Sequence, residues 1–205
     1  MRFMLELSGA GTMPYFGDYD DGYVIDLGNE DPRPAILRAM QAAVVSSAEV
    51  TTCEAAFWLD VLDRKKPDKP HHLASTAFPD SGYYLLQSPT DQASLVFDCG
   101  NLGFGSIAAH GHADALSFVL RLRGDDILVD PGTYDYFTYP DWRNHFRTTR
   151  AHNTIEIDGQ DQSTMGGAFL WAWHAAARCR HWAPSDQGGA VAGVHHGYER
   201  LADPV

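Results

Sequence analysis

The second part of the chain is built from short runs in which apolar and polar residues alternate. From Phe78 on, these runs are GYYLLQS, SLVFDCG, ALSFVLRLR, DDILVD and NTIEIDG, each bounded by glycine, proline, aspartate or asparagine. Alternation with a period of two is typical of strands with one buried face, and the bounding residues form turns. Because no stretch with helical spacing separates the runs, they predict an antiparallel β-sandwich or barrel.

The first part of the chain has helical spacing instead. Apolar residues recur at helical positions between residues 36 and 44. Thr51 and Glu54 form a capping box in front of a second apolar stripe. A charged linker that contains prolines, residues 64–72, follows these two predicted helices. The sequence therefore predicts a short helical lead before the β-rich part.

Length and composition agree with this division. The chain has 205 residues and 44% hydrophobic residues, which is enough for one sizeable core or two small ones. We expect a domain of residues 1–70, including the linker, and a domain of residues 71–205. The expected fold class is α+β and mainly β, with the helical lead followed by an antiparallel β-sandwich.

Charge and cysteine usage exclude several classes of function. The formal net charge is -12, which argues against nucleic acid as a partner because phosphate binding needs a basic face. A polyanionic substrate is compatible only with cations gathered in one cleft. No apolar run is long enough to span a membrane. The three cysteines follow no CxxC pattern, so neither a disulfide framework nor a zinc finger is expected.

Aspartates are concentrated near the start of the chain, in the segment TMPYFGDYDDGYVIDL. We interpret this segment as an acidic, solvated loop. A calcium loop is less favoured, because the spacing of Asp18, Asp20 and Gly22 lacks the later bidentate glutamate of an EF-hand.

Three histidines and two aspartates form the most informative pattern. His110 and His112 are separated by one glycine, so an extended segment would point both side chains to one face. Asp114 extends the pattern to H-x-H-x-D, and Asp130 and His152 follow at a distance. Such nitrogen and oxygen ligands suit zinc, which often takes three protein ligands. An ordinary buried cluster, with His112 and His152 bonded to Asp130, remains an equal alternative at this point.

The pattern also fits two families of metal enzymes incompletely. In metallo-β-lactamase-type hydrolases, the aspartate of H-x-H-x-D is followed by another histidine, whereas Ala115 stands here. Cupins need a glutamate a few residues after the histidine pair, and none precedes the predicted strand at residues 115–123. A metal-dependent hydrolase or cupin-like enzyme therefore stays an alternative.

The combined run HGHADALSF…ILVDPGTY…WRNHFRTTRAHNTIEIDG resembles the C-terminal β-domain of the heparinase II/III family of polysaccharide lyases, which includes alginate lyases. FPDSGYYLLQS resembles the first strands of that domain, and MPYFGDYDDG resembles the last part of the family's α/α toroid. The resemblance implies that the helical lead is the end of a toroid and that the chain is truncated at both ends.

The resemblance also implies a reaction. These enzymes cleave the bond at C4 of a uronic acid by β-elimination, in which a base removes the C5 proton. A hydrogen-bond donor or cation must neutralise the substrate carboxylate, because enolate-like charge develops there. A general acid helps the glycosidic oxygen to leave. No cofactor takes part in the bond breaking.

Matching residues can be assigned on the same basis. His110 resembles the catalytic histidine of the cleft. His112, Asp130 and His152 resemble the ligands of a structural zinc ion that braces the β-domain beside it. The general acid of the alginate-lyase branch is a tyrosine, for which Tyr139 is the closest match.

The nearby Tyr134 and Tyr136 are alternatives for this tyrosine, and Tyr134 is also assigned to substrate binding. Arg143 and Arg147 are the cations expected to bind substrate carboxylate or sulfate.

The family takes its main base from the toroid, upstream of this sequence. We therefore expect the full-length protein to be a lyase of heparan-type or alginate-type glycans, and the present chain to bind metal without being active. The expected partner is an anionic polysaccharide or oligosaccharide, with no nucleic acid or membrane, and a homodimer is kept open. The family implies a periplasmic or secreted enzyme. The alternative from another class is a non-catalytic carbohydrate-binding or scaffolding β-module.

Overall fold

The computed structural model describes residues 14–18 and 74–205. The helices predicted between residues 34 and 63 lie outside the described residues. The described residues 14–18 and 74–205 belong to one compact unit. The predicted domain bounds, 1–70 and 71–205, stay a prediction. Within the described residues, no helix combines the length and the apolar character needed to cross a membrane.

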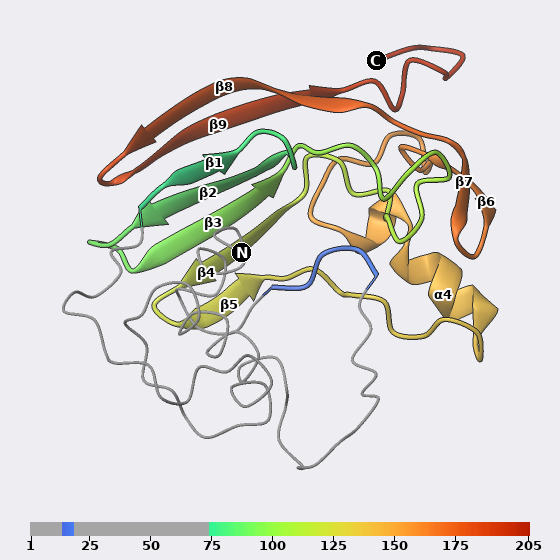
Figure 1. Ribbon diagram of the computed structural model, residues 1–205, viewed down its shortest axis with the longest axis horizontal. Helices are drawn as coiled ribbons and strands as arrows, with labels where there is room; N and C mark the ends of the chain where they lie inside the picture. Colours follow the sequence, from blue (N-terminus) through green and yellow to red (C-terminus); the bar gives the residue numbers. More distant parts are fainter. Residues whose placement is uncertain (1–13, 19–73) are drawn as a thin grey trace, which may run out of the picture. The chain divides into compact units, whose positions relative to one another are not determined.

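The unit is built on a five-stranded antiparallel sheet, in which the strands follow one another in sequence order (Figure 1). The strands are β1 (Thr76–Phe78), β2 (Tyr83–Ser88), β3 (Ala93–Asp98), β4 (Phe118–Leu122) and β5 (Asp125–Leu128). The β2–β3 hairpin pairs Tyr83 with Asp98 and Ser88 with Ala93. The predicted antiparallel, mainly β fold is confirmed, because four of the five runs of alternating residues become these strands.

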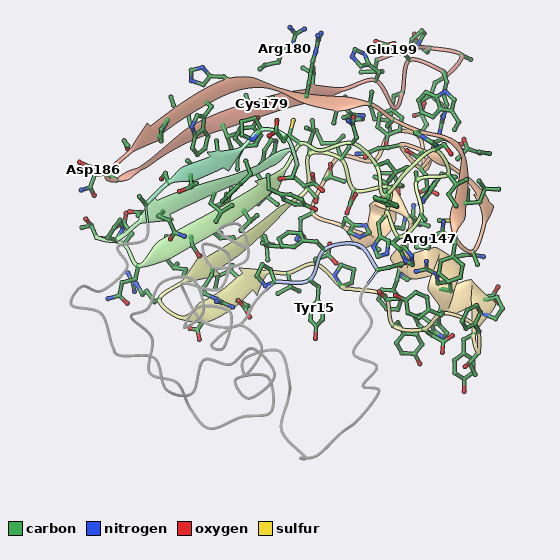
Figure 2. All side chains as sticks on the ribbon, viewed as in Figure 1. Tyr15, Arg147, Cys179, Arg180, Asp186 and Glu199 are labelled. Atoms are coloured by element: carbon green, nitrogen blue, oxygen red, sulfur yellow. The ribbon has the colours of Figure 1, made fainter. Side chains whose placement is uncertain are left out.

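A second layer covers this sheet. The long hairpin of β8 (Ala177–Ser185) and β9 (Gly188–His195) lies along β1, β2 and β3 (Figure 1). Tyr84 of β2 packs against Trp182 of β8 with ring centroids 5.4 Å apart, and Ser75 donates a hydrogen bond to the carbonyl of Gly188 (3.0 Å). Asp186 marks the tip of this hairpin (Figure 2). The two layers give the predicted sandwich arrangement.

The run NTIEIDG was predicted as a strand, and this prediction is wrong. Only one isolated bridge, between Ile157 and Gln160, forms there. The polar side chains instead bond to backbone carbonyls of other segments. The Asn153 amide donates to the carbonyls of Phe118 and Val129 (3.1 and 2.8 Å), and these bonds tie the segment to the ends of β4 and β5.

The structure also contains a helix that the sequence analysis missed. Helix α4 (Pro140–Phe146) and the 3-10 turn Thr149–Ala151 lie between β5 and a small hairpin of β6 (Thr164–Gly167) and β7 (Leu170–Trp173). Pro140 occupies the first turn, where its missing N–H costs nothing. Trp142 and Phe146, four positions apart, stack with centroids 5.8 Å apart.

A small core beneath this region holds the segment with the two histidines. Trp171 of β7, buried with Ala108 and Ala113, packs against Leu102 and Met165. Its indole N–H donates to the carbonyl of Gly111, between the two histidines, at 3.0 Å. This hydrogen bond therefore attaches the His110-Gly111-His112 segment to strand β7.

Residues 14–18 pack against the same segment. The ring of Phe16 meets Tyr83 edge-on with centroids 5.0 Å apart, and the backbone N–H of Asp18 donates to the carbonyl of His110 (2.9 Å). Gly17 has a φ of +57°, and a Cβ atom there would lie 2.6 Å from the His110 carbonyl oxygen. Only glycine permits this close approach.

Candidate functional site

The two histidines of the H-x-H pattern lie in an irregular loop and not in a strand. His110 adopts a left-handed backbone conformation with φ of 64°, which is rare for a residue other than glycine. The His110 side chain is 59% exposed, whereas that of His112 is fully buried. Despite the irregular backbone, both rings reach the carboxylate of Asp18. The segment thus presents one histidine to solvent and one to the interior.

His112 and His152, two of the predicted metal ligands, face each other in the interior. Nδ1 of His112 lies 3.2 Å from Nε2 of His152. The opposite nitrogen of each ring faces an acceptor: His152 Nδ1 lies 2.7 Å from the carbonyl of Thr148, and His112 Nε2 lies 3.0 Å from Asp18 Oδ1. These acceptors have no proton to give, so each outer nitrogen carries the hydrogen. In the neutral form of both rings, the two facing nitrogens then both present lone pairs, an arrangement that fits a shared cation.

Carboxylates stand beside this histidine pair. One ligand atom each from His112, Asp114 and His152 lie within 4.8 Å of one another, which makes a three-residue group able to hold a metal ion. Asp130, the predicted third ligand, lies slightly apart, with Oδ2 3.6 Å from His152 Nε2. Its other oxygen accepts a hydrogen bond from the N–H of Gly132 (2.8 Å) in the Asp-Pro-Gly turn. The structure thus groups Asp114, and not the predicted Asp130, with the two histidines, and it places Asp130 next to His152.

The electrostatics of the interior favour a cation at the same place. Burial raises the pKa of Asp130 to about 6, despite a hydrogen bond from Gly132. Burial, together with Asp98 and Asp130, holds the pKa of Asp114 well above its usual range. Burial and the neighbouring His112 lower the pKa of His152 to about 4. The carboxylates are thus costly to ionise and His152 is costly to protonate, and a bound metal ion would offset both costs.

Asp18 is a site residue that the sequence analysis missed. The expected solvated loop is wrong for this residue, because its side chain is fully buried. Both carboxylate oxygens accept hydrogen bonds from the Arg143 guanidinium, one of them from Nη2 at 2.6 Å. Burial by itself would raise the pKa of Asp18, but the hydrogen bonds from His112 and Arg143 outweigh it and lower the pKa to about 2. Asp18 is therefore a permanent anion in the site.

Arg143 and Arg147, predicted to bind substrate, lie in the interior, each 1% exposed. Besides Asp18, Arg143 contacts the carbonyl of Ala168 (3.0 Å). Arg147 donates to the carbonyl of Gly167 (2.9 Å), and its guanidinium lies 4.7 Å from the ring centroid of Trp171. Burial lowers the pKa of Arg147 to about 10. These contacts favour a role in holding the site together, and the substrate-binding role of the two arginines stays a prediction.

The predicted tyrosines Tyr134 and Tyr139 are exposed, at 64% and 55%. Their ring centroids are 6.5 Å apart, and Tyr134 also stacks on Phe146 (5.4 Å). Tyr136 has different aromatic neighbours. The ring of Phe169 stacks on Tyr136 at 5.6 Å and also contacts the His110 ring at 5.5 Å. The choice of Tyr139 as the general acid stays a prediction, with Tyr136 linked to His110 through Phe169.

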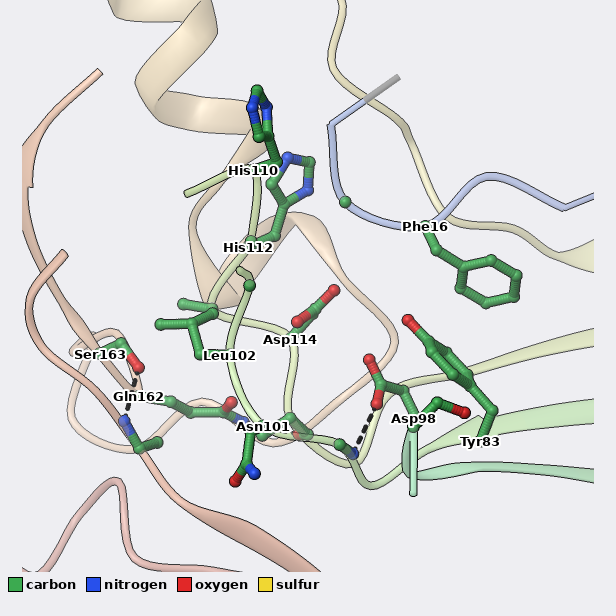
Figure 3. A pocket seen from close by; sticks show the side chains of 18 of the residues that line it. Phe16, Tyr83, Asp98, Asn101, Leu102, His110, His112, Asp114, Gln162 and Ser163 are labelled. Carbon is green, nitrogen blue, oxygen red and sulfur yellow. Dashed lines mark hydrogen bonds between the residues drawn. The ribbon is translucent and has the colours of Figure 1, made fainter. Parts of the chain in front are cut away.

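A cavity of about 360 Å³ lies along the histidine segment. Its polar lining includes His112, Asp114, Asp98, Tyr83 and Gln162 (Figure 3). Asp98 accepts a hydrogen bond from the N–H of Gly100 (2.8 Å), and Tyr83 hydrogen-bonds to the same carboxylate. Burial raises the pKa of Asp98 to about 6. The cavity is therefore acidic in composition, and burial makes the ionised form of Asp98 and Asp114 more costly than it would be in water.

These features define a β-sandwich domain with an exposed histidine directly above a buried histidine–carboxylate cluster. The sequence of residues 70–205 matches the family described as "Heparinase II/III-like, C-terminal". The chain belongs to this family. No curated protein matches the sequence.

Solved structures support the fold. A heparinase III gene product covers 90% of this chain with a TM-score of 0.56 and 20% identity. A mutant of the heparan sulfate lyase HepC from Pedobacter heparinus covers 87% with a TM-score of 0.51 and 22% identity. A further heparinase III covers 88% with a TM-score of 0.50 and 19% identity. The chain spans 25%, 24% and 27% of these three proteins, respectively.

Proposed function

We propose that this chain is the C-terminal β-domain of a polysaccharide lyase that cleaves uronic-acid-containing glycans by β-elimination. Membership of the heparinase II/III-like family supports the reaction class. Two of the similar structures are described as heparinase III and heparan sulfate lyase, which favours a heparan-type substrate over alginate. The same relationship leads us to propose an exported enzyme, periplasmic or secreted, with an anionic polysaccharide as its partner.

The observation that carries the proposal is the placement of His110. Its Nδ1 lies 3.2 Å from Asp18 Oδ2, so in the neutral ring this nitrogen holds the hydrogen and Nε2 has a lone pair. The ring is the exposed one of the site and can meet a ligand. We propose that His110 takes part in the transfer of the C5 proton in the cleft, and that Tyr139 or Tyr136 donates a proton to the leaving oxygen. In this reaction the C5–H and C4–O bonds break and a C4–C5 double bond forms.

We further propose that His112 and His152, with Asp130 or Asp114, hold a zinc ion. Two facing imidazole nitrogens and a carboxylate are a donor set that zinc takes, and each histidine bonds through its other nitrogen to an acceptor, as metal-bound histidines usually do. Zinc would supply a structural cross-link that holds the loop of His110. The residues that would hold the metal lie on the buried side of the loop, so the ion would brace the loop and would not contact the substrate.

The test compares three variants of the whole protein on heparan sulfate and alginate, with ultraviolet absorbance of the unsaturated product and elemental analysis as readouts. His110→Ala is expected to reduce kcat by about 10²–10⁴-fold while one zinc per chain is retained. His112→Ala is expected to lose the zinc. His181→Ala, at an exposed position of β8, is the matched control and is expected to change neither readout.

Two results would overturn the proposal. Formation of no unsaturated product from any uronate glycan would exclude the lyase. Cleavage that stops on chelation alone, without an unsaturated product, would identify a metal-dependent hydrolase instead. The 205-residue chain by itself is expected to bind zinc and to be inactive.

A further inference from the structure

One carboxylate, that of Asp18, touches both halves of the site. Its Oδ2 lies 3.2 Å from Nδ1 of the exposed His110, and its Oδ1 lies 3.0 Å from Nε2 of the buried His112. We propose that Asp18 is a positioning residue that fixes the ring orientation and tautomer of both histidines at once, and so couples metal binding at His112 to the alignment of His110. This inference rests on the proposed zinc site and lyase function.

The carboxylate is itself held rigidly. Arg143 grips both oxygens, and the same guanidinium also donates to the carbonyl of Ala168 (3.0 Å). The rings of Tyr136 and Phe169 lie 5.1 and 5.3 Å from the guanidinium carbon. Each oxygen of Asp18 therefore accepts one bond from Arg143 and one from a histidine, which uses the four acceptor positions of a carboxylate. Asp18 has no freedom to rotate without losing two charge-assisted bonds.

The backbone sets the register between Asp18 and its partners. The N–H of Asp18 donates to the carbonyl of His110 at 2.9 Å, while the side chain reaches the ring of the same residue. Gly17 allows the two backbones to approach closely, since a Cβ atom would lie 2.6 Å from that carbonyl. His110 is thus held by Asp18 at both its backbone and its side chain.

The chemical consequence differs between the two rings. In the neutral His110 ring, an acceptor at Nδ1 selects the tautomer whose Nε2 has the lone pair. In the neutral His112 ring, an acceptor at Nε2 selects the tautomer whose Nδ1 has the lone pair and faces His152. Carboxylates that orient a metal-bound or catalytic histidine in this way are common in enzymes. Here a single carboxylate, that of Asp18, orients both the histidine of the proposed zinc site and the histidine of the proposed catalytic site.

The test uses Asp18→Asn, which keeps the shape and removes the charge. Zinc affinity is measured by competition with a chromophoric chelator and is expected to fall about 10–100-fold. Asp186→Asn, the same substitution at the exposed tip of the β8–β9 hairpin, is the matched control and is expected to bind zinc as the wild type does. Because Asp18→Asn leaves Arg143 buried without its partner, the double variant Asp18→Asn/Arg143→Gln removes both charges and guards against loss of folding.

A second readout is independent of both zinc and activity. Long-range ¹H–¹⁵N spectra of the metal-free protein at mildly alkaline pH show which ring nitrogen carries the hydrogen. The wild type is expected to show His110 protonated at Nδ1 and His112 at Nε2, and Asp18→Asn is expected to show mixed tautomers at both rings. A merely structural role of Asp18 would not change these tautomers in a folded variant.

The outcomes separate the two proposals. A wild-type chain that binds no zinc overturns the metal part of the proposed function, and the tautomers still decide the role of Asp18. The positioning role is overturned if the wild-type rings carry the opposite tautomers, or if folded Asp18→Asn keeps the wild-type tautomers and zinc affinity.

Discussion

Trp171 is the side chain on which the position of the histidine loop depends most directly. It is 2% exposed, its indole N–H donates to the carbonyl of Gly111 at 3.0 Å, and Arg147 stacks on its ring at 4.7 Å. Replacement by phenylalanine keeps an aromatic ring but removes the donor. The variant Trp171→Phe therefore tests whether β7 holds the loop in place.

The expected cost can be assembled from these contacts. A buried carbonyl of Gly111 that loses its donor costs about 1–3 kcal/mol. A weaker stack with Arg147 and the small void left by the shorter ring add about 1 kcal/mol. The free energy of unfolding should fall by about 3 kcal/mol, which corresponds to a decrease of about 1–2 M in the urea midpoint.

The assay is urea unfolding followed by far-ultraviolet circular dichroism. Trp173→Phe is the matched control on the same strand, because Trp173 is 37% exposed and packs only loosely, with Arg200 at 5.5 Å from its ring. This control should lose less than about 1 kcal/mol. If the two variants unfold at the same urea concentration, the indole–Gly111 bond does not anchor the loop, and the reasoning fails.

Other contacts lead to three further predictions. Burial raises the pKa of Asp98 from 3.8 to about 6, so the folded protein retains a proton that the unfolded chain has lost between these values. This proton should lower stability by up to about 3 kcal/mol as the pH rises through this window, and Asp98→Asn should remove that share of the dependence measured by urea unfolding at pH 4 to 7. Gly111→Ala would place a Cβ atom 2.6 Å from the backbone nitrogen of Gly103. It should destabilise the protein by about 1–3 kcal/mol and weaken binding at the proposed zinc site, and a stable variant with unchanged zinc affinity would contradict this. Arg150→Ala breaks the pair with Glu156 (3.0 Å) and should change the thermal midpoint little, since water and salt screen an ion pair whose arginine is exposed.

The sequence predicted the sheet better than the loops. Alternation located the strands from β2 to β5, because the pleat of a half-buried strand imposes a period of two on the residues themselves. The run NTIEIDG has the same alternation, but Asn153 donates hydrogen bonds to carbonyls of other segments. These side-chain bonds compete with strand pairing, and the alternation of apolar and polar residues does not reveal them. The short helix α4 was not predicted, because a helix of seven residues is too short to show the repeat of apolar positions by which helices are recognised.

The candidate site was predicted in part. The pairing of His112 with His152 followed from the family resemblance, because spacing alone left a metal site and an ordinary buried cluster equally open. Asp18 could not be placed, since its bond to His110 spans 92 positions of the chain and nothing local marks it. The burial of Arg143 and Arg147 could not be predicted either, because their partners Asp18 and Gly167 come from other segments of the chain.

The attachment of residues 14–18 to the β-domain has a consequence for how such domains can be exchanged. The family match begins at residue 70, so Asp18 lies outside the part by which the domain is recognised. A graft of residues 74–205 onto another member of the family would carry both histidines of the loop and leave behind the anion that they share. Successful chimeras should therefore inherit the short upstream strip and the β-domain from the same parent, and the two should vary together among natural sequences.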